Sequence, residues 1–207
     1  MKLCYVTDRK ALPGSPAGQL RSITLKIKDA ERAGVDWIQI REKDLHARSL
    51  YALVREVMPG CLSKPCISVN DRLDVALAAG AHGVHLGEES LQVADARRFL
   101  ERTPVDGFLF GVSAHSVKSV QQAEADGADY VIFGPVFRTP SKLAYGLPHG
   151  LQQLAVACRA VSIPVLAIGG ITVENALQCA EAGAAGVAAI RLFQDADDLE
   201  AVVRALR

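Results

Sequence analysis

Length, composition and charge exclude several classes of protein at the outset. The chain has 207 residues, and half of them are hydrophobic, which is enough for a sizeable core and argues against a disordered chain. Lysine plus arginine and aspartate plus glutamate both number 23, so the formal net charge is zero and a basic nucleic-acid-binding surface is not expected. At about 100–200 residues per domain, we expect residues 1–207 to form one domain.

The start of the chain and its cysteines indicate a compartment. No apolar run approaches the ~20 residues that span a bilayer, and Asp8 and Arg9 stand where a signal peptide needs its apolar stretch. We therefore expect a cytoplasmic protein with no membrane partner. The cysteines number five, and an odd count does not make a disulfide framework, so we expect all of them to be inert.

Short apolar runs recur along the chain, and each is followed by a segment with helical periodicity, such as residues 20–33 and 116–126. The predicted strands are residues 3–6, 37–41, 66–69, 83–86, 109–112, 130–133, 165–168 and 186–190. Strands that alternate with helices predict a parallel sheet with right-handed crossovers. Eight such units of about 26 residues each fit a compact α/β fold of the (β/α)8 TIM-barrel type.

A repeated glycine supports this division of the chain. A glycine ends four of the predicted helices, just before a strand, at Gly34, Gly80, Gly127 and Gly183. The spacings between successive glycines are 46, 47 and 56 residues. Glycine commonly takes the left-handed conformation that ends a helix. A doubly wound sheet is the main alternative fold, but it normally has fewer strands, and no G-x-G-x-x-G motif follows the first strand.

In a (β/α)8 barrel the active site lies on the loops after the strands. Gln39, Arg41 and Lys43 alternate after the second predicted strand, which points all three side chains inward. Two buried cations are costly without a partner. They therefore either meet an anionic ligand or pair internally with Glu42 or Asp44.

Oxygen and nitrogen ligands follow the third and fourth predicted strands. Asn70 and Asp71 end the third strand, where Asp71 either caps the next helix or binds Mg²⁺. His85 belongs to the fourth strand and is expected to face the barrel mouth. Ser90 suits a helix N-cap, and the neighbouring Glu89 suits the positive end of that helix.

Ser113 and His115 follow the fifth predicted strand, and Ser116 is expected to cap the next helix. His115 lies on a strand-to-helix loop, where a histidine can act as an acid or base near neutral pH. A lone histidine is more often structural, so both interpretations stay open.

The sixth strand leads into a long loop whose hydroxyl and ammonium groups suit phosphate oxygens, namely those of Thr139, Ser141 and Lys142. After the seventh strand, Gly169 and Gly170 either form a tight turn or let the backbone approach an anion at a helix N-terminus. Arg191 follows the eighth strand and either reaches the same phosphate or is an exposed cation.

Taken together, these segments resemble the thiamine-phosphate synthase and thiazole tautomerase family over nearly the whole chain. The motifs that carry the resemblance are IREK (40–43), VNDR (69–72), GVHLG (83–87), GVSAHS (111–116), GPVFRTPSK (134–142) and AIGGI (167–171). The resemblance implies a (β/α)8 barrel that works in thiamine biosynthesis. Synthases of this family join hydroxymethylpyrimidine diphosphate to a thiazole phosphate and release diphosphate.

The resemblance also implies roles for individual positions. Substrate-binding positions of the family match Gln39, Arg41, Lys43, Asn70, His85, Thr139, Ser141, Lys142 and Gly170. Asp71 matches one of the carboxylates that hold Mg²⁺, and Ser113 matches a position near the reacting centre. In the synthase reaction, Mg²⁺ and cationic side chains stabilise the charge of the departing diphosphate.

Two positions depart from the synthase pattern. Synthases usually carry the second Mg²⁺ carboxylate where this chain has Ser90, so we predict that the neighbouring Glu89 replaces it beside Asp71. Arg191 stands where a small hydroxyl residue is usual, and it either tightens phosphate binding or obstructs the thiazole.

Three functions therefore remain open. The near-complete set of diphosphate-binding residues favours a synthase that uses Mg²⁺. A thiazole tautomerase would use His115 to move a proton and would not need the full metal site. A non-catalytic relative that binds a phosphorylated ligand is the third hypothesis, and a homo-oligomer is compatible with all three.

Overall fold

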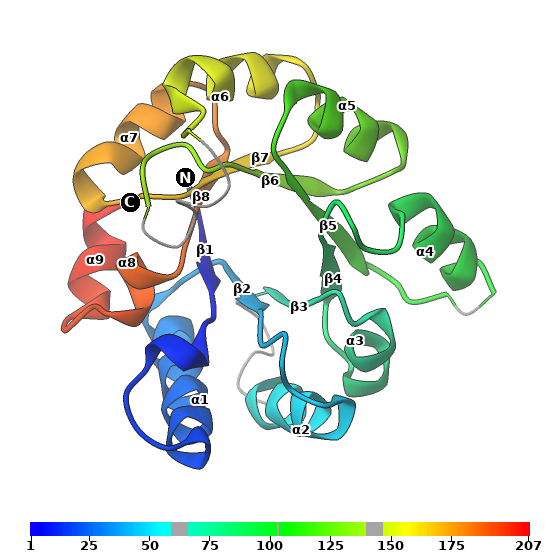
Figure 1. Ribbon diagram of the computed structural model, residues 1–207, viewed down its shortest axis with the longest axis vertical. Coiled ribbons are helices and arrows are strands. Elements are labelled where there is room, and N and C mark those ends of the chain that lie inside the picture. Colours follow the sequence, from blue (N-terminus) through cyan, green and yellow to red (C-terminus); the bar gives the residue numbers. More distant parts are fainter. Residues whose placement is uncertain (59–65, 103, 140–146) are drawn as a thin grey trace.

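A computed structural model describes residues 1–58, 66–102, 104–139 and 147–207, and its eight parallel strands close into a barrel in chain order (Figure 1). The strands are β1 (Lys2–Val6), β2 (Trp37–Ile40), β3 (Cys66–Asn70), β4 (Gly83–Leu86), β5 (Leu109–Ala114), β6 (Tyr130–Phe133), β7 (Val165–Ile168) and β8 (Gly186–Ala189). The predicted (β/α)8 fold is confirmed. Strands β4, β6 and β7 have the predicted bounds, and the other strands differ from them by one or two residues at an end.

Helices surround the barrel on its outer side (Figure 1). They are η1 (Arg9–Ala11), α1 (Pro16–Ala33), α2 (Ala47–Val57), α3 (Leu73–Ala79), α4 (Val93–Leu100), α5 (Val117–Ala125), α6 (Gly150–Arg159), α7 (Val173–Glu181), α8 (Arg191–Gln194) and α9 (Leu199–Ala205). The predicted helix-ending glycines have positive φ angles of 88°, 74°, 90° and 101° at Gly34, Gly80, Gly127 and Gly183. No helix within the described ranges is long and apolar enough to cross a membrane.

Helix starts were predicted with mixed success. Ser116 caps α5 as expected, in a capping box with Ser119. Helix α1 begins at Pro16, before the predicted residue 20, because the Ser15 hydroxyl caps it and proline fits the first turn.

The prediction that Ser90 caps a helix is wrong, and so is the helix cap that was one of two alternatives for Asp71. Helix α4 begins only at Val93, after Gln92, and helix α3 begins after Arg72, in both cases without a side-chain cap. The Asp71 side chain instead accepts a hydrogen bond from the Ser90 hydroxyl group. Two loops that follow neighbouring strands are therefore joined to each other, and neither of these side chains is used by its helix.

The barrel interior is narrow and largely apolar. Cys4, Val6, Tyr130, Ile132, Leu166 and Ala188 form a cluster there, separate from the larger core between the strands and the helices. The described cysteines are unpaired, and burial raises the pKa of Cys66 and Cys179 to about 11. Both thiols are therefore protonated at neutral pH, as expected of inert residues. Cys61 lies outside the described residues.

Candidate active site

A chain of hydrogen bonds joins the ends of β2 and β3 at the barrel mouth. The buried Gln39 amide donates from Nε2 to Asn70 Oδ1 at 2.8 Å, and Asn70 Nδ2 donates to Asp71 Oδ2 at 2.5 Å. Gln39 directly precedes the IREK motif (40–43), and Asn70 and Asp71 belong to the VNDR motif (69–72). The chain orients the Asp71 carboxylate at the end of β3.

Asp71 has an unusual backbone conformation for a residue with a side chain, with a φ angle of 60°. Its Oδ1 accepts hydrogen bonds from the Ser90 hydroxyl and, at 3.3 Å, from the Gly87 N–H group. Lys43 Nζ lies 3.9 Å from its Oδ2. The Asp71 carboxylate is thus the centre of a cluster of oxygen and nitrogen groups that is open to solvent at one side.

The structure brings Ser90, and not Glu89, against Asp71. Glu89 is exposed and forms no hydrogen bond or ion pair within the described residues. Those residues also contain no group of three or more His, Cys, Asp or Glu side chains that could hold a metal ion. Mg²⁺ in phosphate-processing enzymes often takes only one or two protein carboxylates and completes its shell with water and substrate phosphates. The Asp71 carboxylate and the Ser90 hydroxyl fit such a partial site.

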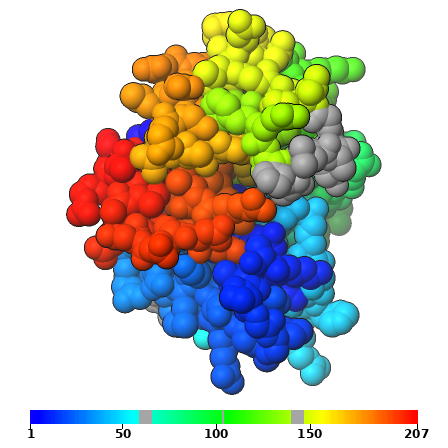
Figure 2. Space-filling view, turned by 60° about the vertical axis from the view of Figure 1, so that its left-hand side comes forward, coloured from blue at the N-terminus to red at the C-terminus, as the bar shows by residue number. Residues whose placement is uncertain are grey.

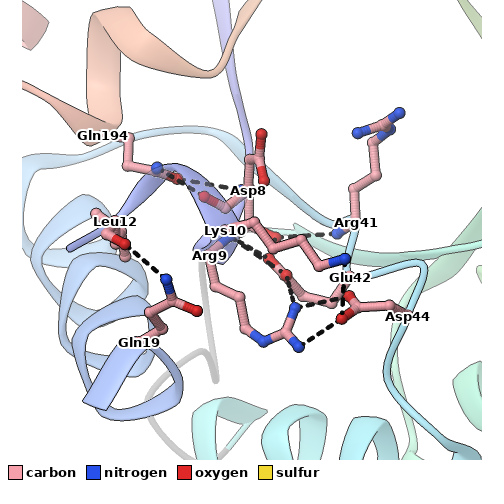
Figure 3. A network of polar contacts seen from close by, with 10 residues as sticks. Asp8, Arg9, Lys10, Leu12, Gln19, Arg41, Glu42, Asp44 and Gln194 are labelled. Atoms are coloured by element: carbon pink, nitrogen blue, oxygen red, sulfur yellow. Dashed lines mark hydrogen bonds and ion pairs between the residues drawn. The ribbon is translucent and has the colours of Figure 1, made fainter. Parts of the chain in front are cut away.

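The sequence left open whether Glu42 and Asp44 neutralise the inward cations. They do not, because Arg9 takes both carboxylates. Arg9 Nη1 lies 3.2 Å from Glu42 Oε2 and 2.7 Å from Asp44 Oδ1, and Lys10 Nζ lies 3.2 Å from Asp44 Oδ2 (Figure 3). The Arg9 hydrogen bonds hold the pKa of Asp44 well below its usual range, whereas burial raises the pKa of Glu42.

This arrangement leaves Arg41 available. Its side chain extends away from the Arg9 network in Figure 3, and it has no carboxylate partner within the part of the chain that the structure describes. Its backbone N–H donates to Thr7 Oγ1 at 3.0 Å, and the Thr7 hydroxyl donates to Glu42 Oε1 at 2.7 Å. The network thus fixes the backbone of Arg41 without neutralising its guanidinium group.

Helix α8 packs against the loop that follows β1. Gln194 is buried, donates from Nε2 to the Asp8 carbonyl oxygen at 2.8 Å, and accepts from the Asp8 N–H at 3.1 Å. Figure 2 shows the orange-red C-terminal segment beside the blue N-terminal one. Arg191, the first residue of α8, is exposed and has no ion pair among the described residues. Arg9 and Gln194 were missed by the sequence analysis.

His85 and Ser113 meet between β4 and β5. His85 is 1% exposed, and its Nε2 lies 2.9 Å from Ser113 Oγ. Burial lowers the pKa of His85 to about 3, with smaller opposing effects from Asp71, which raises it, and Arg41, which lowers it. His85 is therefore neutral at physiological pH and contacts Ser113 as a neutral imidazole.

His115 lies apart from this pair. Its Nδ1 contacts the Gly134 carbonyl oxygen, and its backbone N–H donates to Glu88 Oε1 at 3.0 Å. Burial lowers the pKa of His149, and the nearby His115 lowers it further. Glu88 and His149 are therefore two further polar residues near His115. His149 lies far beyond the end of β6 in the sequence, so no local pattern indicated its place near His115.

Gly169 and Gly170 form a tight turn against the segment after β6. Their φ angles are 98° and 66°. A Cβ at Gly169 would lie 2.6 Å from Pro135 Cβ, and one at Gly170 would lie 2.5 Å from the Arg138 carbonyl oxygen. The two glycines thus allow a close approach between backbone segments of the protein itself, at Pro135 and Arg138. Thr139 lies at the end of the same segment, and Ser141 and Lys142 lie outside the described residues.

The fold and the site together define a (β/α)8-barrel enzyme. Its described residues bring hydrogen-bond donors, the Asp71 carboxylate and an arginine without an ion pair among them to the barrel mouth, as suits a phosphorylated substrate. A family model described as thiamine monophosphate synthase matches residues 3–193. The chain therefore belongs to the thiamine monophosphate synthase family, and it is a transferase of thiamine biosynthesis.

Individual relatives agree with this assignment. The thiamine-phosphate synthase of Roseiflexus castenholzii is 44% identical over 203 residues, which cover 97% of this chain and 84% of that protein. The thiamine-phosphate synthase of Methanoculleus marisnigri is 43% identical over 193 residues, covering 92% and 89%. The solved thiamine phosphate pyrophosphorylase from Pyrococcus furiosus matches with a TM-score of 0.81 at 32% identity and covers 100% of this chain and 93% of that chain. A 3-hexulose-6-phosphate synthase, with a TM-score of 0.73 and 19% identity, shares the fold.

Proposed function

We propose that this chain joins hydroxymethylpyrimidine diphosphate to thiazole phosphate and that the residues at the barrel mouth bind the diphosphate while it departs. The observation that carries the assignment of the site is the division of charge at the end of β2. Arg9 takes Glu42 and Asp44, so Arg41 keeps its full positive charge for an anion. A guanidinium group is well suited to phosphate oxygens because its donors are planar and paired.

The other mouth residues have complementary roles in this proposal. Gln39 and Asn70 bind the pyrimidine diphosphate at the end of β3. Lys43 forms an ion pair with the Asp71 carboxylate beside them. Ser113 donates a hydrogen bond to an oxygen of the departing diphosphate, and His85 orients Ser113 beside the pyrimidine. Bond cleavage leaves a pyrimidine methylene cation, which the thiazole nitrogen captures.

In this proposal Asp71 and Ser90 would hold Mg²⁺, and the exposed Glu89 stays the second ligand that the sequence predicted. When bound, Mg²⁺ neutralises the charge that develops on the diphosphate. We assign Thr139, Ser141 and Lys142 to the diphosphate, and Gly169, Gly170 and Arg191 to the thiazole phosphate. His115 would move a proton in the alternative tautomerase reaction. Homo-oligomerisation and a cytoplasmic location also stay predictions.

The experiment that tests this function combines purified protein, both substrates and Mg²⁺, and detects thiamine phosphate. We expect product with Mg²⁺, much less product with excess chelator, and a large rise in KM for the pyrimidine diphosphate in Arg41→Met. Lys10→Met is the matched control, because Lys10 is an exposed cation bound to Asp44. Absence of product, with both substrates shown to bind, would contradict the proposal, and conversion of a thiazole carboxylate phosphate alone would identify a tautomerase.

A further inference from the structure

A line of polar side chains crosses the interior of the barrel below its mouth. The Tyr130 hydroxyl lies 3.3 Å from His85 Nδ1, and His85 Nε2 lies 2.9 Å from Ser113 Oγ. Tyr130 is buried among apolar residues and packs against Trp37, with the ring centroids 4.5 Å apart and the rings tilted by 47°. Ser113 is partly exposed, whereas His85 and Tyr130 are buried.

A glycine makes the contact between Tyr130 and His85 possible. In the barrel, Gly111 on β5 is in register with His85 on β4 and with Tyr130 on β6. A Cβ at Gly111 would lie 2.1 Å from Tyr130 Cζ and 2.6 Å from His85 Nδ1. Two rings from strands that are not neighbours therefore meet over the strand between them, because that strand carries no side chain at this position.

The hydrogen atoms in this line can be arranged in two ways. A neutral imidazole has one N–H group, so one ring nitrogen of His85 donates and the other accepts. If Tyr130 donates to Nδ1, then Nε2–H donates to Ser113 Oγ, and the Ser113 hydroxyl hydrogen is left for a ligand. If Nδ1–H donates to Tyr130, then Ser113 donates its hydrogen to Nε2 and offers a ligand only lone pairs.

The charge of the substrate selects the first arrangement. Ionised phosphate oxygens only accept hydrogen bonds, so Ser113 must donate to them. A phenol hydroxyl group donates a hydrogen bond more strongly than it accepts one, so Tyr130 is suited to donate to Nδ1. The donors then run in one direction, from Tyr130 through His85 to Ser113, and aligned hydrogen bonds strengthen one another.

We propose that Tyr130 is a positioning residue that fixes the Nε2–H tautomer of His85 and thereby turns the Ser113 hydroxyl hydrogen toward the anionic substrate. This inference rests on the proposed function, which places Ser113 beside the departing diphosphate. Gly111 is the residue that permits the arrangement, since any side chain at position 111 would separate Tyr130 from His85.

The test is a double-mutant cycle of Tyr130→Phe and Ser113→Ala on the purified enzyme, with kcat and KM measured for the pyrimidine diphosphate. Tyr130→Phe keeps the ring against Trp37 and removes only the hydroxyl group. We expect it to lower kcat by about tenfold, the effect of losing one oriented hydrogen bond, with little change in KM. In the Ser113→Ala background, the same substitution has no further effect on kcat, because the group it orients is already absent.

Tyr5→Phe is the matched control. It also removes a buried tyrosine hydroxyl, one that donates to Gln194 Oε1 at 2.9 Å, and it leaves kcat close to that of the wild type. Nitrogen-15 NMR of labelled histidine gives an independent readout: His85 has a protonated Nε2 and an unprotonated Nδ1 in the wild type, and Tyr130→Phe mixes the two tautomers.

The outcomes separate the inference from the proposed function. If Ser113→Ala leaves kcat unchanged, the role of Ser113 in the proposed function fails, and this inference fails with it. If Ser113→Ala lowers kcat but Tyr130→Phe has no effect, or has the same effect in both backgrounds, the proposed function stands and the inference is overturned. A protonated Nδ1 in the wild type overturns it as well.

Discussion

The Ser90 hydroxyl group donates a hydrogen bond to the Asp71 carboxylate, across two loops whose residues are 19 positions apart. Ser90 therefore occupies the place beside Asp71 at which synthases of this family usually carry a second carboxylate. The site of this chain has one negative charge fewer at that place. Its Mg²⁺ affinity is accordingly expected to depend more on the phosphate oxygens of the substrate than on the protein.

Ser90→Asp restores the missing charge, and we expect it to tighten Mg²⁺ binding by about tenfold, because the number of charged ligands sets the affinity of such sites. The measurement is Mg²⁺ titration by calorimetry and by activity. Ser90→Asn is a control of the same size without charge and gives no gain. A loss of Mg²⁺ affinity in Glu89→Gln would show instead that Glu89 moves to the metal, as the sequence analysis predicted.

Arg9→Met tests the network that frees Arg41. Removing Arg9 leaves the Glu42 carboxylate buried without its cation, and we expect a loss of about 3 kcal/mol in the free energy of unfolding. We also expect a higher KM for the pyrimidine diphosphate, because Glu42 then attracts the Arg41 guanidinium. Urea denaturation and steady-state kinetics measure the two effects.

Lys10→Met is the control for this substitution. Lys10 pairs with the same carboxylate, Asp44, but its side chain is 64% exposed, so we expect a change within about 0.5 kcal/mol. If Arg9→Met were as stable as Lys10→Met, the network would not have the structural role that its burial indicates.

The sequence predicted the barrel well because its signals are local. An apolar run and the glycine just before it lie within a few residues of each other, and they set the strand bounds to within two residues. Ser113 was expected just after β5 and lies within it, because β5 runs two residues past its prediction.

The site was harder to predict because its decisive contacts are distant along the chain. Arg9 lies 33 positions before Glu42, whereas Arg41 and Lys43 are the immediate neighbours of Glu42. The sequence therefore left open whether Glu42 pairs with these neighbours. Likewise, the contact between Tyr130 and His85 depends on Gly111, and no sequence pattern shows that this glycine lies between the two rings. Residue types at strand ends thus located the mouth, but only the barrel register decides which side chains meet there.

His85 gives the protein a specific pH dependence of stability. Its pKa is lowered from 6.5 to about 3 by burial, while Asp71 opposes this shift and Arg41 adds to it. The unfolded chain therefore binds a proton below pH 6.5 that the folded protein does not bind. Stability from this residue is complete above pH 6.5 and is lost as the pH falls toward 3, by about 1.4 kcal/mol at pH 5.5.

The measurement is urea denaturation of the wild type and of His85→Gln between pH 5 and 8. The glutamine variant lacks the titrating group, so the difference in unfolding free energy between the two proteins narrows as the pH falls below 6.5. A difference that stays constant over this range would contradict the prediction. Contributions of other titrating groups, including His82 and His149, cancel in the comparison.

The turn after β7 allows backbone strain to be separated from steric contact. Gly170 and Gly14 both have positive φ angles, of 66° and 104°, but only at Gly170 would a Cβ meet protein atoms within 4 Å. Gly14→Ala therefore carries only the conformational cost, about 1 kcal/mol.

Gly170→Ala must in addition push away the Arg138 carbonyl oxygen at 2.5 Å, so we expect a loss of about 3 kcal/mol or more in unfolding free energy, measured by urea denaturation. We also expect a higher KM for thiazole phosphate in Gly170→Ala alone. Equal unfolding free energies of the two variants would contradict this prediction. They would mean that the segment after β6 moves away at no cost and that its contact with the turn does not stabilise the turn.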